Sequence, residues 1–440
     1  MGKIDDFFRF EIDNRLFDRT DNYGLHPWEA VRYHVCTAVI GGAQHVMSNP
    51  RQKGWKTFIK DLLVFVVYLM RHKYCKYMFI MSSRDRIGNE FYDKIANDMY
   101  VIVNRSRCFT IDTLNHGESH SVYKDDSCSN VLMVLLRRFP WKCYTYKEEH
   151  FLLSSTFPGF SMTQHELENL YREFIVQYFV YKFLLRFCHV RKVFIVQNGI
   201  HKGLFAAANK LGVEVLEFQH GQISRNHTSY SYPEDTSITS EKLYHPNKLL
   251  TFGSFWNKNR IYPGVENVVL GNNSYAYPFD YSITNGNRTI LVVANKDDGI
   301  FLNKFVKDIL TTDDSFRFLF KLHPNQYKDY NSFCKLFVDC PQVEVVTDGK
   351  NISQLLSVAE CILVVQSTVE LEALRVGRKV FVIKYGAYEL MDFVFEEKGV
   401  YLIKNSAEFL DLYNKTINEK LPQRDDLFAP FDKNIARSLM

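Results

Sequence analysis

Residues 213–233 have the sequence Val-Glu-Val-Leu-Glu-Phe-Gln-His-Gly-Gln-Ile-Ser-Arg-Asn-His-Thr-Ser-Tyr-Ser-Tyr-Pro. The first six residues alternate and are mainly apolar, which predicts a buried strand at 213–218. Gly221 follows shortly afterwards and permits a sharp turn that a side chain would obstruct. Ligands of open α/β sheets bind outside the carboxyl ends of the strands. His220 is therefore expected where such proteins usually do their chemistry.

His220 has two interpretations, a structural histidine with its hydrogen bonds satisfied and a general base. A neutral imidazole with a pKa of about 6.5 is well suited to deprotonating a hydroxyl group at neutral pH. The position of His220 and the adjacent glycine favour the base. Glu217 precedes it by three residues in an alternating strand, so we expect its side chain to face the opposite way unless the turn starts early, and not to serve as a catalytic acid.

The segment after His220 looks too polar to belong to a core, and it predicts a loop on the acceptor side of a site. Arg225 is a candidate partner for an anionic group, although exposed arginines usually do nothing specific. The residues expected on the acceptor side are Gln219, Gly221, Arg225, His227, Tyr230 and Tyr232.

A chain of 440 residues exceeds the size of one ordinary core, so two domains are expected. The stretch at 271–288 is rich in Asn, Ser, Tyr, Pro and Gly and predicts a linker. The predicted domains are therefore an acceptor domain at 1–272, which includes an N-terminal extension, and a nucleotide domain at 288–440. We expect both to be Rossmann-like α/β domains that face a cleft.

Alternating strands and helices support this fold class in both halves. Further strands of the first half are expected at 76–81, 192–197, 249–252 and 268–270, and helices at 55–70, 90–99, 163–187 and 204–211. Strands of the second half are expected at 289–294, 316–322, 343–347, 361–365 and 379–384, and helices at 299–310, 328–338, 351–359 and 368–376.

A histidine and a proline end the predicted strand at 316–322. A residue before proline is disfavoured in the α region, so His323 is held extended at the strand end by Pro324. Its ring can donate a hydrogen bond to a phosphate oxygen. The alternative is a surface turn, because a second such dipeptide at His245 lies in a polar loop and shows that the pair can arise without function.

Ser367 and Thr368 lie between a predicted strand and a predicted helix. The free N–H groups and positive end of such a junction suit a phosphate, and the hydroxyl groups add donors. Ser367 with Glu370 also forms the pattern of a capping box, which needs no ligand. The sequence Asp297-Asp298-Gly299 after the strand at 289–294 predicts a solvated turn.

The overall composition excludes several classes of protein. A formal charge of +4 is too small to indicate a nucleic-acid partner, and no nucleic-acid-binding motif is evident. The nine scattered cysteines predict reduced thiols and neither a disulfide framework nor a zinc site. No apolar signal core occurs near the N-terminus, and the longest apolar run, 62–70, is too short to span a bilayer. These features predict a cytoplasmic protein, with room for peripheral contact with the membrane.

The two predicted halves, the His-Gly turn, the His-Pro pair and the Ser-Thr pair together resemble the GT-B glycosyltransferases of bacterial capsule and lipopolysaccharide synthesis. The likeness is to transferases that use CMP-sialic acid or CMP-Kdo, and to CDP-glycerol glycerophosphotransferases. The resemblance implies that His220 is the base. It also implies that His323, Ser367 and Thr368 contact the phosphate, and Pro324 and Glu370 belong to the same motifs.

The sequence thus leads to the hypothesis of an inverting, metal-independent glycosyltransferase without a cofactor. It would move a sugar from a nucleotide-sugar donor, with CMP-sugars favoured, to a hydroxyl group of a glycan or glycolipid acceptor. One alternative is an isomerase that resembles UDP-N-acetylglucosamine 2-epimerase. Another is a non-catalytic scaffold of a polysaccharide assembly complex, which would bind no nucleotide.

Overall fold

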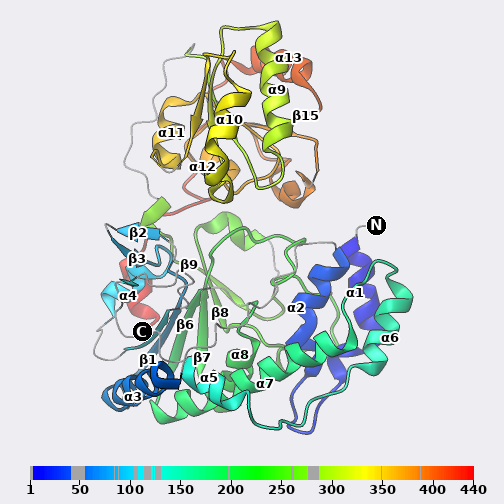
Figure 1. The fold of residues 1–440 in the computed structure, drawn as a ribbon, viewed down its shortest axis with the longest axis vertical. Coiled ribbons are helices and arrows are strands. Elements are labelled where there is room, and N and C mark those ends of the chain that lie inside the picture. The colour runs from blue at the N-terminus through cyan, green and yellow to red at the C-terminus, as the bar shows by residue number, and fades with distance from the viewer. Residues whose placement is uncertain are drawn as a thin grey trace. The chain divides into compact units, whose positions relative to one another are not determined.

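The computed structural model describes residues 3–40, 55–83, 85–87, 89–103, 108–112, 120–121, 123, 130–196, 199–258, 262–275, 287–347, 349–386 and 388–440. It divides into two compact units, each of which is described by itself (Figure 1). Unit 1 contains residues 1–252, 256–270 and 431–440, and unit 2 contains residues 253–255 and 271–430. The last ten residues belong to unit 1, whereas the predictions placed them in the second domain, 288–440, and not in the first, 1–272.

Unit 1 is built on a six-stranded parallel sheet with the order β4-β1-β6-β7-β8-β9. Numbered along the chain, this order is 2-1-3-4-5-6, which begins as a flavodoxin-like sheet does. The strands are β1 (Tyr77–Met81), β4 (Cys108–Asp112), β6 (Lys192–Val196), β7 (Glu214–Phe218), β8 (Lys248–Thr251) and β9 (Glu266–Val269). A small second sheet contains β2 (Asp85–Ile87), β3 (Glu90–Tyr92) and β5 (His120–Ser121).

Helices surround the large sheet of unit 1, and Figure 1 shows α1, α2 and α6 gathered on one side of the unit. They are α1 (Lys3–Asp13), α2 (Pro27–Ile40), α3 (Trp55–Arg71), α4 (Asn97–Ile102), α5 (Asn130–Leu136), α6 (Lys147–Thr156), α7 (Gln164–Phe187), α8 (Lys202–Leu211) and α14 (Lys433–Ser438). The short 3₁₀ segments of this part of the chain are η1 (Leu16–Asp18), η3 (Ser240–Lys242) and η4 (Ser254–Lys258), the last of which begins in unit 2.

The long helix α7 and its neighbour α8 begin and end for local chemical reasons. Thr163 and Glu166 form the predicted capping box at the start of α7. Gly212 ends α8 with φ 65°, a left-handed conformation that glycine adopts without strain. A Cβ on Gly203 would lie 2.7 Å from the carbonyl oxygen of Phe174, so the missing side chain lets α8 pack closely on α7.

Unit 2 is built on a second six-stranded parallel sheet, with the order β12-β11-β10-β13-β14-β15. Along the chain this order is 3-2-1-4-5-6, that of a dinucleotide-binding Rossmann sheet, which reverses between β10 and β13. The strands are β10 (Thr289–Val293), β11 (Arg317–Lys321), β12 (Val343–Val346), β13 (Cys361–Val364), β14 (Lys379–Ile383) and β15 (Val400–Ile403). The helices are α9 (Gly299–Thr312), α10 (Tyr330–Leu336), α11 (Ile352–Val358), α12 (Val369–Arg375) and α13 (Ser406–Thr416), with 3₁₀ segments η5 (Asn273–Tyr275), η6 (Pro324–Asp329) and η7 (Tyr388–Val394).

The two parallel sheets confirm the predicted class of two Rossmann-like α/β domains. The expected helix at 90–99 was wrong, because β3 occupies the first three of these residues and α4 begins only at Asn97. Strands β4 and β15 of the large sheets and all three strands of the small sheet were not predicted. Among the described residues, no helix combines the length and the hydropathy that a membrane span requires. Whether the units face each other across a cleft stays a prediction.

Candidate functional site

His220 lies just beyond the carboxyl end of β7 and is partly exposed. Its Nδ1 lies 3.2 Å from the hydroxyl oxygen of Tyr230, and that hydroxyl donates to Oε1 of Glu217 at 3.0 Å. The hydroxyl of Tyr262 donates to the other carboxylate oxygen of Glu217 at 3.3 Å. The imidazole is therefore connected to a buried carboxylate through one phenol group.

This arrangement bears on two predictions. Glu217 was expected to face away from His220 unless the turn starts early, and the strand does end at Phe218, so that the two side chains reach the same phenol group. The loop after His220 was expected to be too polar for the core, yet Tyr230 and Tyr232 are almost fully buried. A phenol ring can be buried where its hydroxyl has a hydrogen-bond partner, and both of these hydroxyl groups have one.

The hydrogen bonds fix the tautomer of His220. Burial, together with the nearby Glu217, raises the pKa of Tyr230 well above its usual value of 10, so Tyr230 keeps its proton. Because that proton is donated to Glu217, the phenol oxygen accepts the hydrogen on His220 Nδ1. The neutral ring then has its lone pair on Nε2, the form that a general base requires.

The other residues predicted on the acceptor side have mainly structural surroundings. Gln219 is fully buried. Its side chain connects the segment after β8 to the turn after β7, since it accepts from the N–H of Phe252 and donates to the carbonyl oxygen of Gly221. Arg225 is exposed and pairs with Asp5 at 2.8 Å. Gly221 has no positive φ, and a Cβ there would contact nothing within 4 Å, so the expectation that this turn needs glycine was wrong.

His227 packs against the same tyrosine as His220. Its ring centroid lies 4.8 Å from that of Tyr230, and its Nδ1 accepts from the N–H of Ser229 at 3.4 Å. Burial lowers the pKa of His227 to about 4, so the ring is neutral at physiological pH. It supports the tyrosine and holds the loop in place.

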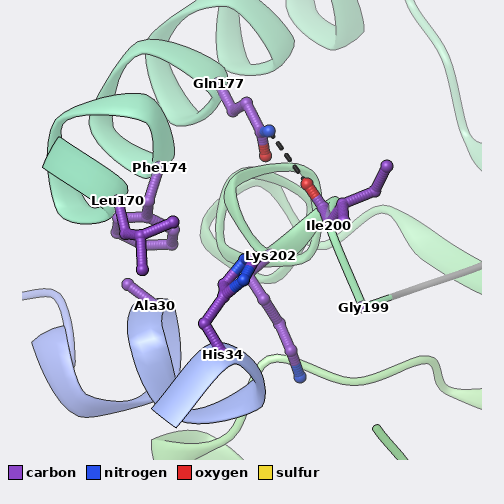
Figure 2. Close-up of a pocket in the computed structure, with 8 residues that line it drawn as sticks. All are labelled: Ala30, His34, Leu170, Phe174, Gln177, Gly199, Ile200 and Lys202. Atoms are coloured by element: carbon purple, nitrogen blue, oxygen red, sulfur yellow. Dashed lines mark hydrogen bonds between the residues drawn. The ribbon is translucent and has the colours of Figure 1, made fainter. Parts of the chain in front are cut away.

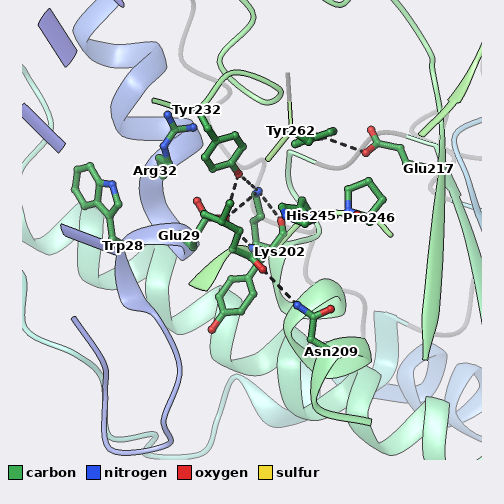
Figure 3. Close-up of polar contacts among 12 residues, drawn as sticks. Trp28, Glu29, Arg32, Lys202, Asn209, Glu217, Tyr232, His245, Pro246 and Tyr262 are labelled. Carbon is green, nitrogen blue, oxygen red and sulfur yellow. Dashed lines mark hydrogen bonds and ion pairs between the residues drawn. The ribbon is translucent and has the colours of Figure 1, made fainter. Parts of the chain in front are cut away.

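A buried ionic network lies beside this site, and sequence analysis did not find it (Figure 3). Lys202 Nζ donates to the carbonyl oxygen of Tyr244 at 2.7 Å and to the hydroxyl of Tyr232 at 3.0 Å, and it lies 3.5 Å from Oε2 of Glu29. The Tyr232 hydroxyl donates to the same Glu29 oxygen at 3.1 Å. Arg32 lies over the ring of Tyr232, with 4.1 Å from its guanidinium carbon to the ring centroid.

The network ties the N-terminal helices to the loop that positions Tyr230. Arg32 also forms a two-pronged ion pair with Glu11 of α1, at 2.6 and 2.9 Å. Removing one partner of a buried ion pair typically costs about 3–5 kcal/mol, because the other charge is left without compensation. The sequence did contain a signal for this network: Glu29 and Arg32 have opposite charges and lie three residues apart in a mainly apolar helix.

The second His-Pro pair is also part of this region. His245, which was expected in a polar loop, is buried, and its ring lies 5.7 Å from that of Tyr262. Its Nδ1 is 2.9 Å from the carbonyl oxygen of Pro246. Burial lowers the pKa of His245, so the ring is neutral and packs against the ring of Tyr262.

A small hollow lies where α2, α7 and the start of α8 meet (Figure 2). The side-chain amide of Gln177 closes one side by donating to the carbonyl oxygen of Ile200 at 2.9 Å. The space left is about that of one water molecule, which is too little for a nucleotide or a sugar. The hollow is lined by Ala30, His34, Leu170, Phe174, Gln177, Gly199, Ile200 and Lys202.

In unit 2, His323 lies at the carboxyl end of β11, as predicted, and the exposed Pro324 begins η6. His323 Nδ1 accepts from the N–H of Asn325 at 3.2 Å, so the neutral ring has its hydrogen on Nε2. Partial burial and the nearby Lys296 both lower the pKa of His323, which favours this neutral form. His323 can therefore donate a hydrogen bond from Nε2 without a change of tautomer.

The two strands at which the sheet order reverses are joined at their carboxyl ends. Asn295, after β10, donates from its side chain to Oε1 of Gln366, after β13, at 3.3 Å. Asp298 was expected in a solvated turn, but it is buried, and its Oδ1 accepts from the N–H of Asn295 at 2.7 Å. Burial raises the pKa of Asp298 to about 6.

The junction between β13 and α12 uses the predicted serine and glutamate for its own structure. Ser367 Oγ accepts from the N–H of Val369 at 3.3 Å, and the N–H of Ser367 donates to Glu370 Oε1 at 2.9 Å. Thr368 is exposed. Because α12 has only seven residues, its dipole contributes little, and hydroxyl and N–H donors remain the main means of holding an anion.

Glu370 itself is an uncharged acid at neutral pH. It is fully buried, and burial raises its pKa to about 8. Its Oε2 has no hydrogen-bond partner among the described residues. Several polar groups therefore lie at the carboxyl ends of β10 and β13, where the strand order of the sheet reverses. They are the protonated carboxyl group of Glu370, Ser367 and the Asn295–Gln366 pair. Rossmann sheets bind their ligands at this place.

Comparisons with known proteins assign no family. No family model matches the chain, and no curated protein matches it. Among solved structures, the UDP-GlcNAc 2-epimerase of Methanocaldococcus jannaschii is 13% identical with a TM-score of 0.47, and the match covers 82% of this chain and 99% of that one. The UDP-GlcNAc 2-epimerase of Neisseria meningitidis is 13% identical with a TM-score of 0.46, and the match covers 82% and 98%.

The MurG protein of Acinetobacter baumannii is also similar, at 11% identity with a TM-score of 0.44, over 78% of this chain and 91% of that one. Similarities at this level decide neither the family nor the reaction of this chain. No group of three or more His, Cys, Asp or Glu side chains within the described ranges could hold a metal ion.

Proposed function

We propose that the chain is an enzyme that acts on a nucleotide sugar, with the nucleotide held by unit 2 and the reactive group of the acceptor deprotonated by His220 of unit 1. The observation that supports this best is the chain of hydrogen bonds from His220 through Tyr230 to Glu217. A buried carboxylate connected in this way favours the imidazolium that forms when His220 takes a proton. A histidine that served structure alone would not need this support.

The favoured reaction is transfer of the sugar to a hydroxyl group. His220 Nε2 takes the proton of the acceptor hydroxyl, whose oxygen forms a new bond to the anomeric carbon. The bond from that carbon to the phosphate oxygen of the nucleotide breaks, and the electron pair leaves with the phosphate. In this proposal the donor groups of His323 and Ser367 stabilise the leaving phosphate, and no metal ion is required.

The identity of the donor stays open between CMP-sugars, which we favour, and other nucleotide sugars. The proposed acceptor is a glycan or glycolipid of a bacterial surface polysaccharide such as capsule or lipopolysaccharide. Both assignments come from the resemblance of the sequence motifs, and both are part of the proposal.

The second candidate is isomerisation of the nucleotide sugar. It is the activity named for two of the solved structures reported above, whose likeness is too low to decide between the two. An isomerase needs the same two parts, a pocket for the nucleotide phosphate and a proton acceptor. In that case the proton that His220 removes would come from the sugar itself.

One experiment separates the candidates. The full chain is incubated with CMP-, CDP- and UDP-linked sugars, first alone and then with saccharide acceptors, and the products are followed by NMR and chromatography. Transfer predicts free nucleotide only when an acceptor is present, whereas isomerisation predicts a new nucleotide sugar without any acceptor. Neither product, together with no binding of any nucleotide, would overturn the proposal in favour of a scaffold.

His220→Ala tests the role of the base in the same assay. We expect turnover to fall by at least about 100-fold, since positioned general bases typically contribute factors of 10² to 10⁴. His165→Ala, which changes an exposed histidine on α7, is the control and should leave turnover unchanged. Wild-type turnover in His220→Ala would remove the base assignment.

A further inference from the structure

Helix α3 (Trp55–Arg71) is apolar on two opposite faces. One face packs on unit 1 through Phe65, Tyr68 and Leu69, which are buried. The opposite face holds six large apolar side chains that are 40–63% exposed. They are Ile59, Leu63, Val64, Val66, Val67 and Met70.

These six residues form one continuous strip. Ile59, Leu63, Val66, Val67 and Met70 are linked by steps of three or four residues, so their side chains lie on the same side of the helix. Val64 precedes Val67 by three residues and lies at the edge of this strip. Figure 1 shows α3 at the edge of unit 1. Single exposed apolar residues are common, but a contiguous apolar strip of this kind indicates a surface that contacts something other than water.

Most charged residues in and around the helix are basic. Between positions 51 and 76 the sequence contains seven basic residues and one acidic residue, Asp61, whereas the whole chain has 54 basic and 50 acidic residues. Of the basic residues, Lys60 and Arg71 are exposed on the helix itself, and Lys76 is exposed just beyond it. Tyr74, which follows the helix, is 74% exposed, and tyrosine is a residue typical of membrane interfaces.

We propose that α3 docks unit 1 on an anionic lipid bilayer. The helix lies in the plane of the interface, with the apolar strip inserted among the acyl chains and Lys60 and Arg71 beside the lipid phosphates. With 17 residues and the other face packed on the protein, it lies on the membrane and does not cross it. The basic residues favour a lipid surface over a second copy of the chain, because two such strips would repel each other.

Co-sedimentation of the full chain with vesicles tests the proposal. The vesicles contain either phosphatidylcholine alone or phosphatidylcholine mixed with phosphatidylglycerol. We expect binding to the mixed vesicles, and loss of it to background in Leu63→Glu combined with Val67→Glu. The matched control is Phe151→Glu combined with Val338→Glu, which places the same charges at two other exposed apolar positions and should bind like the wild type.

The charge contribution is tested separately with Lys60→Ala combined with Arg71→Ala. Each basic residue near an anionic membrane contributes about 1 kcal/mol, so the pair should weaken binding roughly 30-fold, and added salt should reduce the difference. All variants are exposed substitutions, and a thermal melt checks that each is folded.

Two results would overturn the proposal. The first is equal binding of the wild type and the Leu63→Glu, Val67→Glu variant to the mixed vesicles, including no binding by either. The second is a dimer of the wild type in light scattering that this variant abolishes, with no vesicle binding, which would assign the strip to a second copy of the chain.

Discussion

At the scale of residues, the chemistry of His220 depends on groups that its own segment does not reveal. Tyr230 lies ten positions later in the chain and Glu217 lies within the preceding strand, yet both belong to the same hydrogen-bonded chain. Tyr230 and Glu217 position the imidazole and touch no substrate in the proposed reaction. Their effect should therefore appear in turnover and not in substrate binding.

Replacing Tyr230 by Phe removes the hydroxyl that joins His220 to Glu217. We expect kcat to fall by about tenfold or more, the factor associated with one hydrogen bond to a charged group, while KM stays nearly constant. Tyr262→Phe is the matched control, because it removes a hydroxyl that donates to Oε2 of the same carboxylate, whereas Tyr230 donates to Oε1. Equal losses of kcat in the two variants would contradict a specific role for Tyr230.

The sequence predicted the positions of the candidate histidines better than it predicted which residues contact each other in the folded protein. His220 and His323 lie at strand ends as expected, because a buried apolar strand followed by a turn is a local pattern. The burial of Tyr232 and the Glu29–Lys202 contact depend on residues far apart in the chain. Such contacts leave no local pattern in one sequence.

At the scale of elements, the β13–α12 junction is held by Glu370. In the unfolded chain this carboxyl group ionises near pH 4.5, but in the folded protein its pKa is about 8. Between these values the unfolded chain loses its proton while the folded protein keeps it. The stabilising contribution of this group is therefore complete below about pH 4.5 and is lost as the pH rises toward about 8.

Glu370→Gln should remove this dependence, because glutamine cannot ionise and its carbonyl oxygen can still accept from the N–H of Ser367. Relative to the variant, the wild type should lose stability between pH 5 and pH 8 by at most about 1.4 kcal/mol per pH unit. Urea unfolding across this pH range measures the difference. Glu396→Gln, an exposed position in the same unit, is the control. Parallel pH profiles for wild type and Glu370→Gln would contradict the buried neutral acid.

The prediction of elements failed where the local signal was short. Strand β15 has four residues, three of them only partly buried, and it lies at the edge of its sheet, so its apolar run is no stronger than that of many loops. Strand β4 is likewise an edge strand, although it is buried. The central strands, which are buried on both sides, were all predicted.

At the scale of the whole molecule, the two ends of the chain both contribute to unit 1. The backbone carbonyl of Met440 accepts from Lys76 and from the hydroxyl of Tyr77, and α14 packs near α4. The N-terminal helices provide Glu11, Glu29 and Arg32 to the buried network. The N-terminal residues were predicted to belong to the first domain, but their contact with Tyr232 and the contacts of Met440 were not predicted, since both span more than 100 positions of the sequence.

The central claim is that unit 2 holds the nucleotide and that unit 1 provides the base. Titration calorimetry with CMP, CDP and UDP on the wild type, His323→Ala and His220→Ala tests it most directly. We predict that at least one nucleotide binds the wild type, that His323→Ala weakens its affinity at least about tenfold through loss of a hydrogen bond to phosphate, and that His220→Ala leaves the affinity unchanged. Equal affinity in all three proteins, an equal loss in both variants, or no binding at all would contradict the claim.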